Sequence, residues 1–135
     1  MTSPLLDTNI VLRHLLQDDP GQSPRATRIF RDIEAGVMRV RMTDLVMFET
    51  IFTLQRRQRV PREAIRNQLT TLLDLEGIVL PGKTRWREVL DVYVTSGLSL
   101  ADSYHLVMMK RFGTAEIISF DTDFDAIPNI TRIEP

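Results

Sequence analysis

The sequence predicts an α/β fold in which short strands alternate with helices and form a mostly parallel sheet, covered by helices on both faces. Three observations predict it. Short apolar runs end at turn residues, longer segments carry apolar residues at helical spacing, and the two kinds of segment alternate along the chain. The 135 residues suit one domain with one core, so we expect residues 1–135 to form a single domain.

The first structured stretch combines both kinds of segment. Residues 4–6 are a short apolar run that ends on Asp7, which predicts a buried strand. A helix to residue 16 should follow, with Thr8 or Asn9 as its N-cap, because these side chains accept hydrogen bonds from free N–H groups of a first turn.

Capping residues and glycines set the later boundaries. Ser23, Thr43 and Ser99 are suited to begin helices, whereas Gly77 and Gly113 are suited to end them. Helices are therefore predicted over residues 23–36, 43–59, 61–76, 83–96 and 99–112, and strands over residues 37–42, 78–80, 116–120 and 130–133.

The composition is that of an ordinary globular chain, 43% hydrophobic and 26% charged. A net charge of −1 gives no global sign of nucleic-acid or membrane binding. Cysteine is absent, which excludes disulfides, thiol nucleophiles and cysteine-ligated zinc and fits a reducing compartment, so we expect a cytoplasmic protein. No apolar run approaches the ~20 residues of a membrane span, and no signal peptide is expected.

Two acids stand directly after predicted strands. Asp7 follows the first apolar run and Asp121 follows the strand over residues 116–120. Ligands of open parallel sheets bind at the carboxyl ends of the strands, so this is where functional acids belong. The structural alternatives are that Asp7 only caps the next helix and that Asp121 opens a turn that also contains Asp123 and Asp125.

Glu49 shares a face of its predicted helix with Leu45, Phe48 and Phe52. A charge within an apolar face is costly unless it is paired or bound to a metal. A buried arginine partner, or a wider polar edge of the helix, would explain Glu49 equally well.

Asp102 falls in the first turn of the helix that Ser99 begins, where an acid suits both a capping box and the helix dipole. The same position also allows the side chain to project into a cleft. His105 lies one turn later on the same face and could support Asp102, although an ordinary surface or core histidine is the simpler interpretation.

Together these four acids can converge at one edge of the sheet. Two carboxylates ~4 Å apart repel by about 1 kcal/mol in water and about 4 kcal/mol at an effective dielectric constant of ~20. The protein must therefore protonate some of them, hold them apart or bind a cation, and carboxylate oxygens favour Mg²⁺ or Mn²⁺ over zinc.

The chain resembles the PIN-domain nucleases and is most similar to the toxins of VapBC toxin–antitoxin systems. The resemblance covers essentially the whole chain and is carried by Leu5-Leu6-Asp7-Thr8-Asn9, the lone Glu49, Leu100-Ala101-Asp102-Ser103 and Ser119-Phe120-Asp121-Thr122-Asp123-Phe124. It implies a sheet of about five parallel strands, a Mg²⁺- or Mn²⁺-dependent ribonuclease activity on RNA, and inhibition by a cognate antitoxin.

The resemblance also implies roles for individual residues. The positions that match the family's catalytic and metal-binding acids are Asp7, Glu49, Asp102 and Asp121; those that match supporting polar positions are Thr8, Asn9 and Ser119; and Asp123 matches an additional acid of some members. The mechanism would be metal-assisted phosphodiester hydrolysis.

Partners follow from the same resemblance and from the surface. RNA needs cations beside an acidic cleft, and Arg13 is the candidate nearest to Asp7 in sequence, within a wider set on the helices. The apolar supply of the helix over residues 43–59 suggests a homodimer. Two other interpretations remain: a catalytically silent RNA- or partner-binding module, and a phosphatase of the haloacid dehalogenase type, for which too little chain follows Asp121-Thr122-Asp123.

Overall fold

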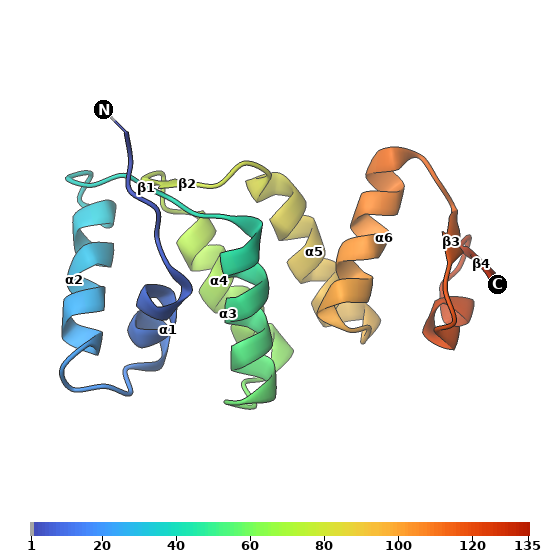
Figure 1. Ribbon diagram of the computed structural model, residues 1–135, viewed down its shortest axis with the longest axis horizontal. Coiled ribbons are helices and arrows are strands. Elements are labelled where there is room, and N and C mark those ends of the chain that lie inside the picture. The colour runs from blue at the N-terminus through green and yellow to red at the C-terminus, as the bar shows by residue number, and fades with distance from the viewer. Residues whose placement is uncertain (1) are drawn as a thin grey trace. The chain divides into compact units, whose positions relative to one another are not determined.

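The computed structural model describes residues 2–135 and divides the chain into two compact units, Met1–Arg87 and Glu88–Pro135. Figure 1 shows the course of the chain through both. The single-domain interpretation stays a prediction. The elements of the first unit are α1 (Thr8–Leu16), α2 (Ser23–Glu34), β1 (Val40–Arg41), α3 (Asp44–Arg56), α4 (Arg62–Leu73), β2 (Ile78–Val79) and the start of α5 (Lys83–Ser96).

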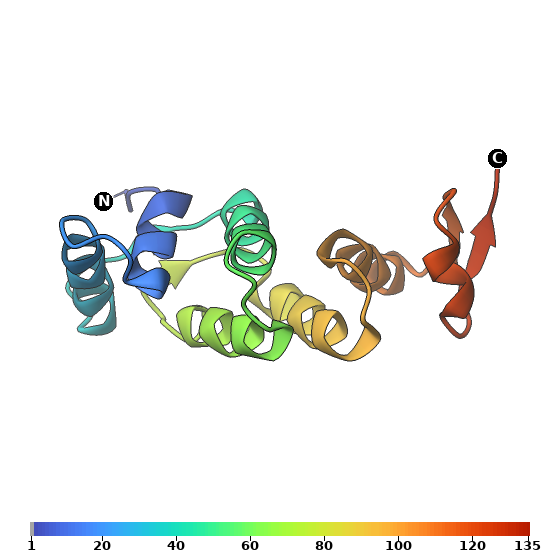
Figure 2. The ribbon, with the colours of Figure 1, turned by 90° about the horizontal axis from the view of Figure 1, so that it is seen from below.

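The first unit surrounds a short parallel strand pair. Val40 of β1 pairs with Ile78 of β2, and Leu5 adds an isolated parallel bridge to Arg41 on the other side of β1. Figure 2 shows α1 and α3 on one side of β2 and α4 on the other. The alternation of strands and helices and the parallel pairing are therefore as predicted.

The core of the first unit is formed mainly by helix faces. The apolar side chains that are essentially inaccessible to solvent are Met47, Ile51, Leu54, Ile65, Leu69, Leu73, Ile78 and Trp86. Trp86 packs edge-on against Phe48, with ring centroids 5.0 Å apart, and its indole N–H donates to Asp44 Oδ1 at 2.7 Å. Arg85 donates to both carboxylate oxygens of Asp44, which joins α5 to the start of α3.

The second unit contains the end of α5, the helix α6 and a second parallel strand pair. Its further elements are α6 (Leu100–Phe112), β3 (Glu116–Ile118), the short 3₁₀ helix η1 (Thr122–Ala126) and β4 (Thr131–Ile133). Glu116 pairs with Thr131 and Ile118 with Ile133, and the connection between these strands contains η1. Phe124 of η1 is buried, whereas Phe112, Ile118 and Phe120 are exposed.

The prediction of one sheet of about five strands is wrong for residues 2–135. All five extended stretches exist and pair in parallel, but they form two separate two-stranded sheets, and the stretch before Asp7 contributes one bridge only. The pairings are two or three residues long, so each strand offers few ladder hydrogen bonds, and most of the buried surface belongs to helices. No helix within residues 2–135 is long and apolar enough to cross a membrane.

Candidate functional site

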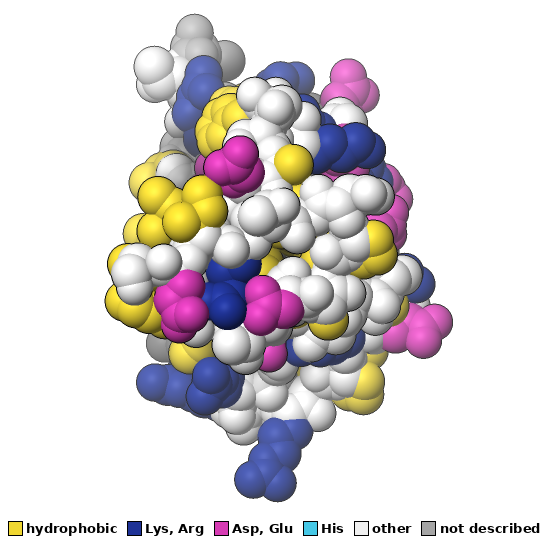
Figure 3. Space-filling model, turned by 90° about the vertical axis from the view of Figure 1, so that its right-hand side faces the viewer, with side chains coloured by type: hydrophobic (Ala, Val, Ile, Leu, Met, Phe, Trp, Pro, Cys, Tyr) yellow, Lys and Arg dark blue, Asp and Glu magenta, His cyan; other side chains and the backbone are white. Residues whose placement is uncertain are grey.

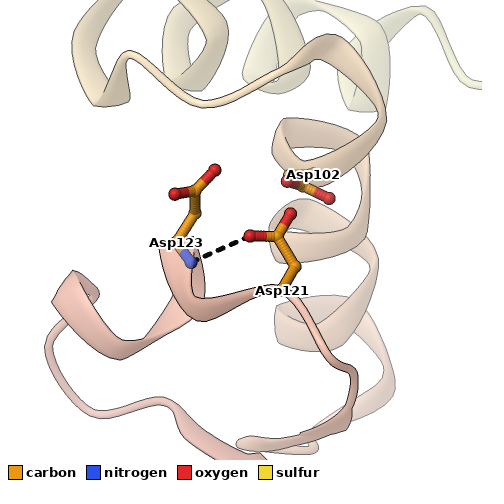
Figure 4. A group of neighbouring side chains, drawn as sticks. All are labelled: Asp102, Asp121 and Asp123. Atoms are coloured by element: carbon orange, nitrogen blue, oxygen red, sulfur yellow. Dashed lines mark hydrogen bonds between the residues drawn. The ribbon is translucent and has the colours of Figure 1, made fainter.

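Three carboxylates of the second unit lie together. Asp102 projects from the first turn of α6, and Asp121 and Asp123 belong to the start of η1. One oxygen of each lies within 4.8 Å of one oxygen of each of the others. Figure 4 shows the three side chains turned toward a common space. The structure thus brings together two of the predicted catalytic acids and the acid predicted only as an additional one.

The capping of α6 places Asp102. The Ser99 side chain accepts a hydrogen bond from the Asp102 backbone N–H at 3.1 Å, and Ser103 Oγ donates to the Ser99 carbonyl oxygen at 2.8 Å. Ser99 is the N-cap that the sequence predicts, and these bonds fix the first turn. The predicted role of Asp102 in the capped first turn of α6 is therefore compatible with a site, because its carboxylate also faces the other two acids.

Hydrogen bonds within the chain after β3 place the other two acids. Asp121 is the N-cap of η1, and its Oδ1 accepts from the Asp123 backbone N–H at 2.9 Å. Ser119 Oγ accepts from the Asp121 backbone N–H at 2.9 Å. Ser119 therefore contacts the backbone of Asp121 and not its carboxylate, and its supporting role stays a prediction.

The environment of the cluster disfavours ionisation of Asp102. Burial raises the pKa of the Asp102 carboxyl group, and the charge of Asp121, together with a hydrogen bond between the two side chains, raises this pKa further. The hydrogen bond with Ser99 and the nearby His105 act in the opposite direction. A divalent cation would relieve the same repulsion, and carboxylate oxygens are the donors that Mg²⁺ or Mn²⁺ prefers, so the residues fit such an ion.

The first unit brings two other predicted acids into one pocket. Asp7 and Glu49 both line a cavity of about 480 Å³, hereafter the acidic pocket, together with Thr8, Asn9 and Arg57. Thr8 Oγ1 donates to Glu49 Oε1 at 3.1 Å, which joins α1 to α3. This hydrogen bond is of the kind predicted for Thr8, and the role of Thr8 in a functional site stays a prediction. Arg57 belongs to a basic stretch after α3, and its place beside two acids was not singled out by the sequence.

Asp7 also has the structural role considered for it. It is the N-cap of α1, and its Oδ1 accepts from the Thr8 backbone N–H at 2.7 Å. The prediction that Thr8 or Asn9 caps this helix is wrong by one or two residues, because the carboxylate of Asp7 is a good cap and precedes both. The Asp7 side chain is exposed, and capping uses only one of its two oxygens.

The reason given for singling out Glu49 is wrong. Leu45 and Phe52, which share its helix face, are 64% and 55% exposed, and Glu49 itself is exposed. The buried residues of α3 are instead Val46, Met47, Thr50, Ile51 and Leu54. Both faces have apolar residues at helical spacing, and tertiary packing selects the second one. What marks Glu49 in the structure is its place beside Asp7 in the acidic pocket.

Two charged residues considered at the sequence level lie elsewhere. Asp125 does not join the carboxylate cluster but forms a two-point pair with Arg132, at 2.9 and 3.1 Å. Arg132 also approaches Glu134, at 3.8 Å. Figure 3 shows that basic and acidic side chains lie next to one another on the face it presents. Arg13 lines a different cavity, between α1 and α2, where it pairs with Asp18 at 3.2 Å.

The comparisons with known proteins agree with these motifs. The family model described as PIN domain matches residues 5–130, which contain Asp7, Glu49, Asp102, Asp121 and Asp123. A search of curated proteins finds no match to this chain. Because the family match spans nearly the whole chain, the protein belongs to the PIN domain family, whose members are generally nucleases.

Proposed function

We propose that the protein is a divalent-metal-dependent ribonuclease that hydrolyses RNA phosphodiester bonds. The observation that carries this proposal is the convergence of Asp102, Asp121 and Asp123. Three oxygen donors from two elements, held by backbone and capping hydrogen bonds, are what a hard divalent cation needs. When bound, Mg²⁺ or Mn²⁺ supplies an activated water and neutralises charge on the phosphate.

The residues of the chain have separate tasks in this proposal. Asp102, Asp121 and Asp123 hold the cation, and Ser99 and Ser119 keep the first two in place through the hydrogen bonds described above. Burial and the charge of Asp121 raise the pKa of Asp102, and the positive charge of a bound ion would favour its ionised form.

We assign Asp7 and Glu49 to the same reaction because they occupy the first two acidic motifs of the family resemblance. Thr8 keeps the Glu49 carboxylate oriented by its 3.1 Å hydrogen bond. The exposed second oxygen of Asp7 remains free for an ion or for a water molecule bound to it.

Cleavage of a mixed RNA panel (transfer RNA, ribosomal RNA and messenger fragments) tests the proposal. We expect cutting with Mg²⁺ or Mn²⁺, none with a chelator, and none by Asp7→Asn or Asp102→Asn. Asp32→Asn is the matched control, since Asp32 lies on α2 outside both acidic groups and its side chain forms no hydrogen bond or ion pair within residues 2–135. RNA binding without cutting by any variant would instead favour a silent binding module.

The proposal extends to a biological role, the toxin of a type II toxin–antitoxin pair with a cognate antitoxin and a homodimeric state. Its support is the family resemblance and the apolar surface that α3 leaves open at Leu45 and Phe52. Induced expression should arrest growth of a bacterial host, and Asp102→Asn should relieve the arrest. Sedimentation at micromolar concentration tests the dimer, and a strict monomer would refute it.

A further inference from the structure

A second cavity of the first unit lies between α1 and α2 and is lined by basic side chains. Its volume is about 480 Å³, within the range of small-ligand sites. Arg13 of α1 and Arg25 and Arg28 of α2 contribute guanidinium groups, and Ile10 and Ile29 contribute aliphatic surface. We call this cavity the basic pocket.

The three arginines of the basic pocket differ in whether other side chains bind them. Arg13 is held in place, because its Nε donates to Gln22 Oε1 at 2.8 Å and its Nη1 contacts Asp18 at 3.2 Å. Arg25 and Arg28 lie one turn apart on α2 and are exposed, and neither forms a hydrogen bond or ion pair with any residue in the range 2–135. Two guanidinium groups are thus available to an anion beside a third that is structurally fixed.

The basic pocket adjoins the acidic pocket. Asn9 lines both cavities, so the first turn of α1 forms their common wall. A ligand extended along this turn would have one part beside Asp7 and Glu49 and the next part beside the arginines. A nucleic-acid strand carries a charge at every unit and an apolar base between charges, which suits a pocket with guanidinium groups and aliphatic surface.

We propose that the basic pocket is a subsite for one nucleotide of single-stranded RNA, next to a nucleotide that lies in the acidic pocket. Arg25 and Arg28 bind its phosphate, for which the planar guanidinium group is suited, and Ile10 and Ile29 contact its sugar or base. This subsite rests on the proposed ribonuclease function for its place in the reaction. Its test uses binding alone, so that the two proposals can fail separately.

The experiment measures fluorescence anisotropy of a 5′-labelled, mixed-sequence 12-nucleotide RNA in EDTA, over a series of NaCl concentrations. The slope of log K against log [NaCl] is negative, and each lost phosphate contact reduces its magnitude by roughly 0.7 for a single strand. The double variant Arg25→Gln with Arg28→Gln should therefore reduce the magnitude of the slope by roughly 1.4 and weaken RNA binding by roughly tenfold at low salt. The lysine pair, Arg25→Lys with Arg28→Lys, should retain the slope.

The matched control is Arg31→Gln with Arg59→Gln, which removes the same charge from two exposed arginines outside the basic pocket. The subsite predicts a slope change below half of that of the pocket variant. Equal changes in the two variants, or a wild-type protein that does not bind the RNA at 25 mM NaCl, would overturn it. Unchanged circular dichroism melting curves establish that the variants are folded.

The outcomes separate the proposals. A slope lowered only by the pocket variant, in a protein that does not cut RNA with Mg²⁺, supports the subsite and removes the nuclease. Metal-dependent cutting with an unchanged slope supports the nuclease and removes the subsite. A glutamate-rich 12-residue peptide that binds wild type but not the pocket variant, while the RNA slope stays unchanged, would make the cavity a protein-docking surface and refute the RNA subsite.

Discussion

Asp123→Asn should stabilise the protein when no divalent cation is present. The Asp123 carboxylate lies within 4.8 Å of both other acids of the cluster, so it takes part in two of the three repulsive pairs. At 4.8 Å each pair costs roughly 0.9 kcal/mol in a water-like dielectric, and less in ~0.1 M salt, where the Debye length is about 10 Å. The side chain of Asp123 makes no hydrogen bond within residues 2–135 that the substitution would break.

The net gain is smaller than two full pairs. Asp121 and Asp123 are two positions apart, so the unfolded chain keeps part of their repulsion. We expect a gain of roughly 0.5–1 kcal/mol in the free energy of unfolding, which for a chain of this size raises Tm by about 2–4 °C. Glu116→Gln is the control, because it removes one acid from the same unit at an exposed side chain outside the cluster.

Added Mg²⁺ should make the wild-type protein more stable than Asp123→Asn. A site that binds the ion only when folded gains about 2.7 kcal/mol at 100 times Kd, and loss of one carboxylate ligand should remove most of this gain from Asp123→Asn. Calorimetric melting in EDTA and in Mg²⁺ measures both effects. A variant that is less stable than wild type in EDTA, or that gains as much from Mg²⁺, would refute the assignment of Asp123 to a cation site.

Three further predictions concern the scaffold. Asp44→Ala removes the acceptor of the Trp86 indole N–H and of Arg85, and should lower the free energy of unfolding by roughly 1–3 kcal/mol in urea titrations, with Asp32→Ala as the milder control. Gly77→Ala would place a methyl group 2.9 Å from the Met38 carbonyl oxygen and from Ile33, so it should destabilise by about 1–3 kcal/mol, whereas Gly21→Ala meets only ordinary contact and should be nearly neutral. Burial lowers the pKa of His14, which stacks on Phe30 with ring centroids 4.2 Å apart. The unfolded chain therefore binds a proton at this histidine more readily than the folded chain, and stability is lost as pH falls below about 6.5, the ordinary pKa of histidine. His14→Gln should flatten that pH dependence in urea titrations at several pH values.

Helix boundaries were the part of the fold that the sequence predicted best. Thr43 and Ser99 cap α3 and α6, as their side chains indicated, and α5 spans the predicted residues 83–96. Capping is a local property, since an oxygen and an N–H a few residues apart decide it. The sheet was predicted less well, because pairing between distant strands depends on contacts that no local pattern contains.

In the candidate site, too, local sequence patterns predicted some features correctly and others wrongly. Asp102 and Asp121 were predicted from their positions in a first turn and after a strand, and they lie together. Asp123 was given only a supporting role, although its two-residue spacing from Asp121 was visible, because a turn rich in aspartate has the same pattern. The burial assumed for Glu49 was wrong because α3 has two apolar faces, and helical periodicity alone does not identify the one that is buried.

The unequal spacing of the two strand pairs has a consequence for the order of folding. Paired residues of β3 and β4, such as Glu116 and Thr131, are 15 positions apart, whereas Val40 and Ile78 of β1 and β2 are 38 apart. Closing the longer loop costs about 0.8 kcal/mol more in chain entropy. We therefore expect the C-terminal pair to close early, so that two of the three clustered carboxylates gain their positions from chain segments close in sequence, before the N-terminal strands meet.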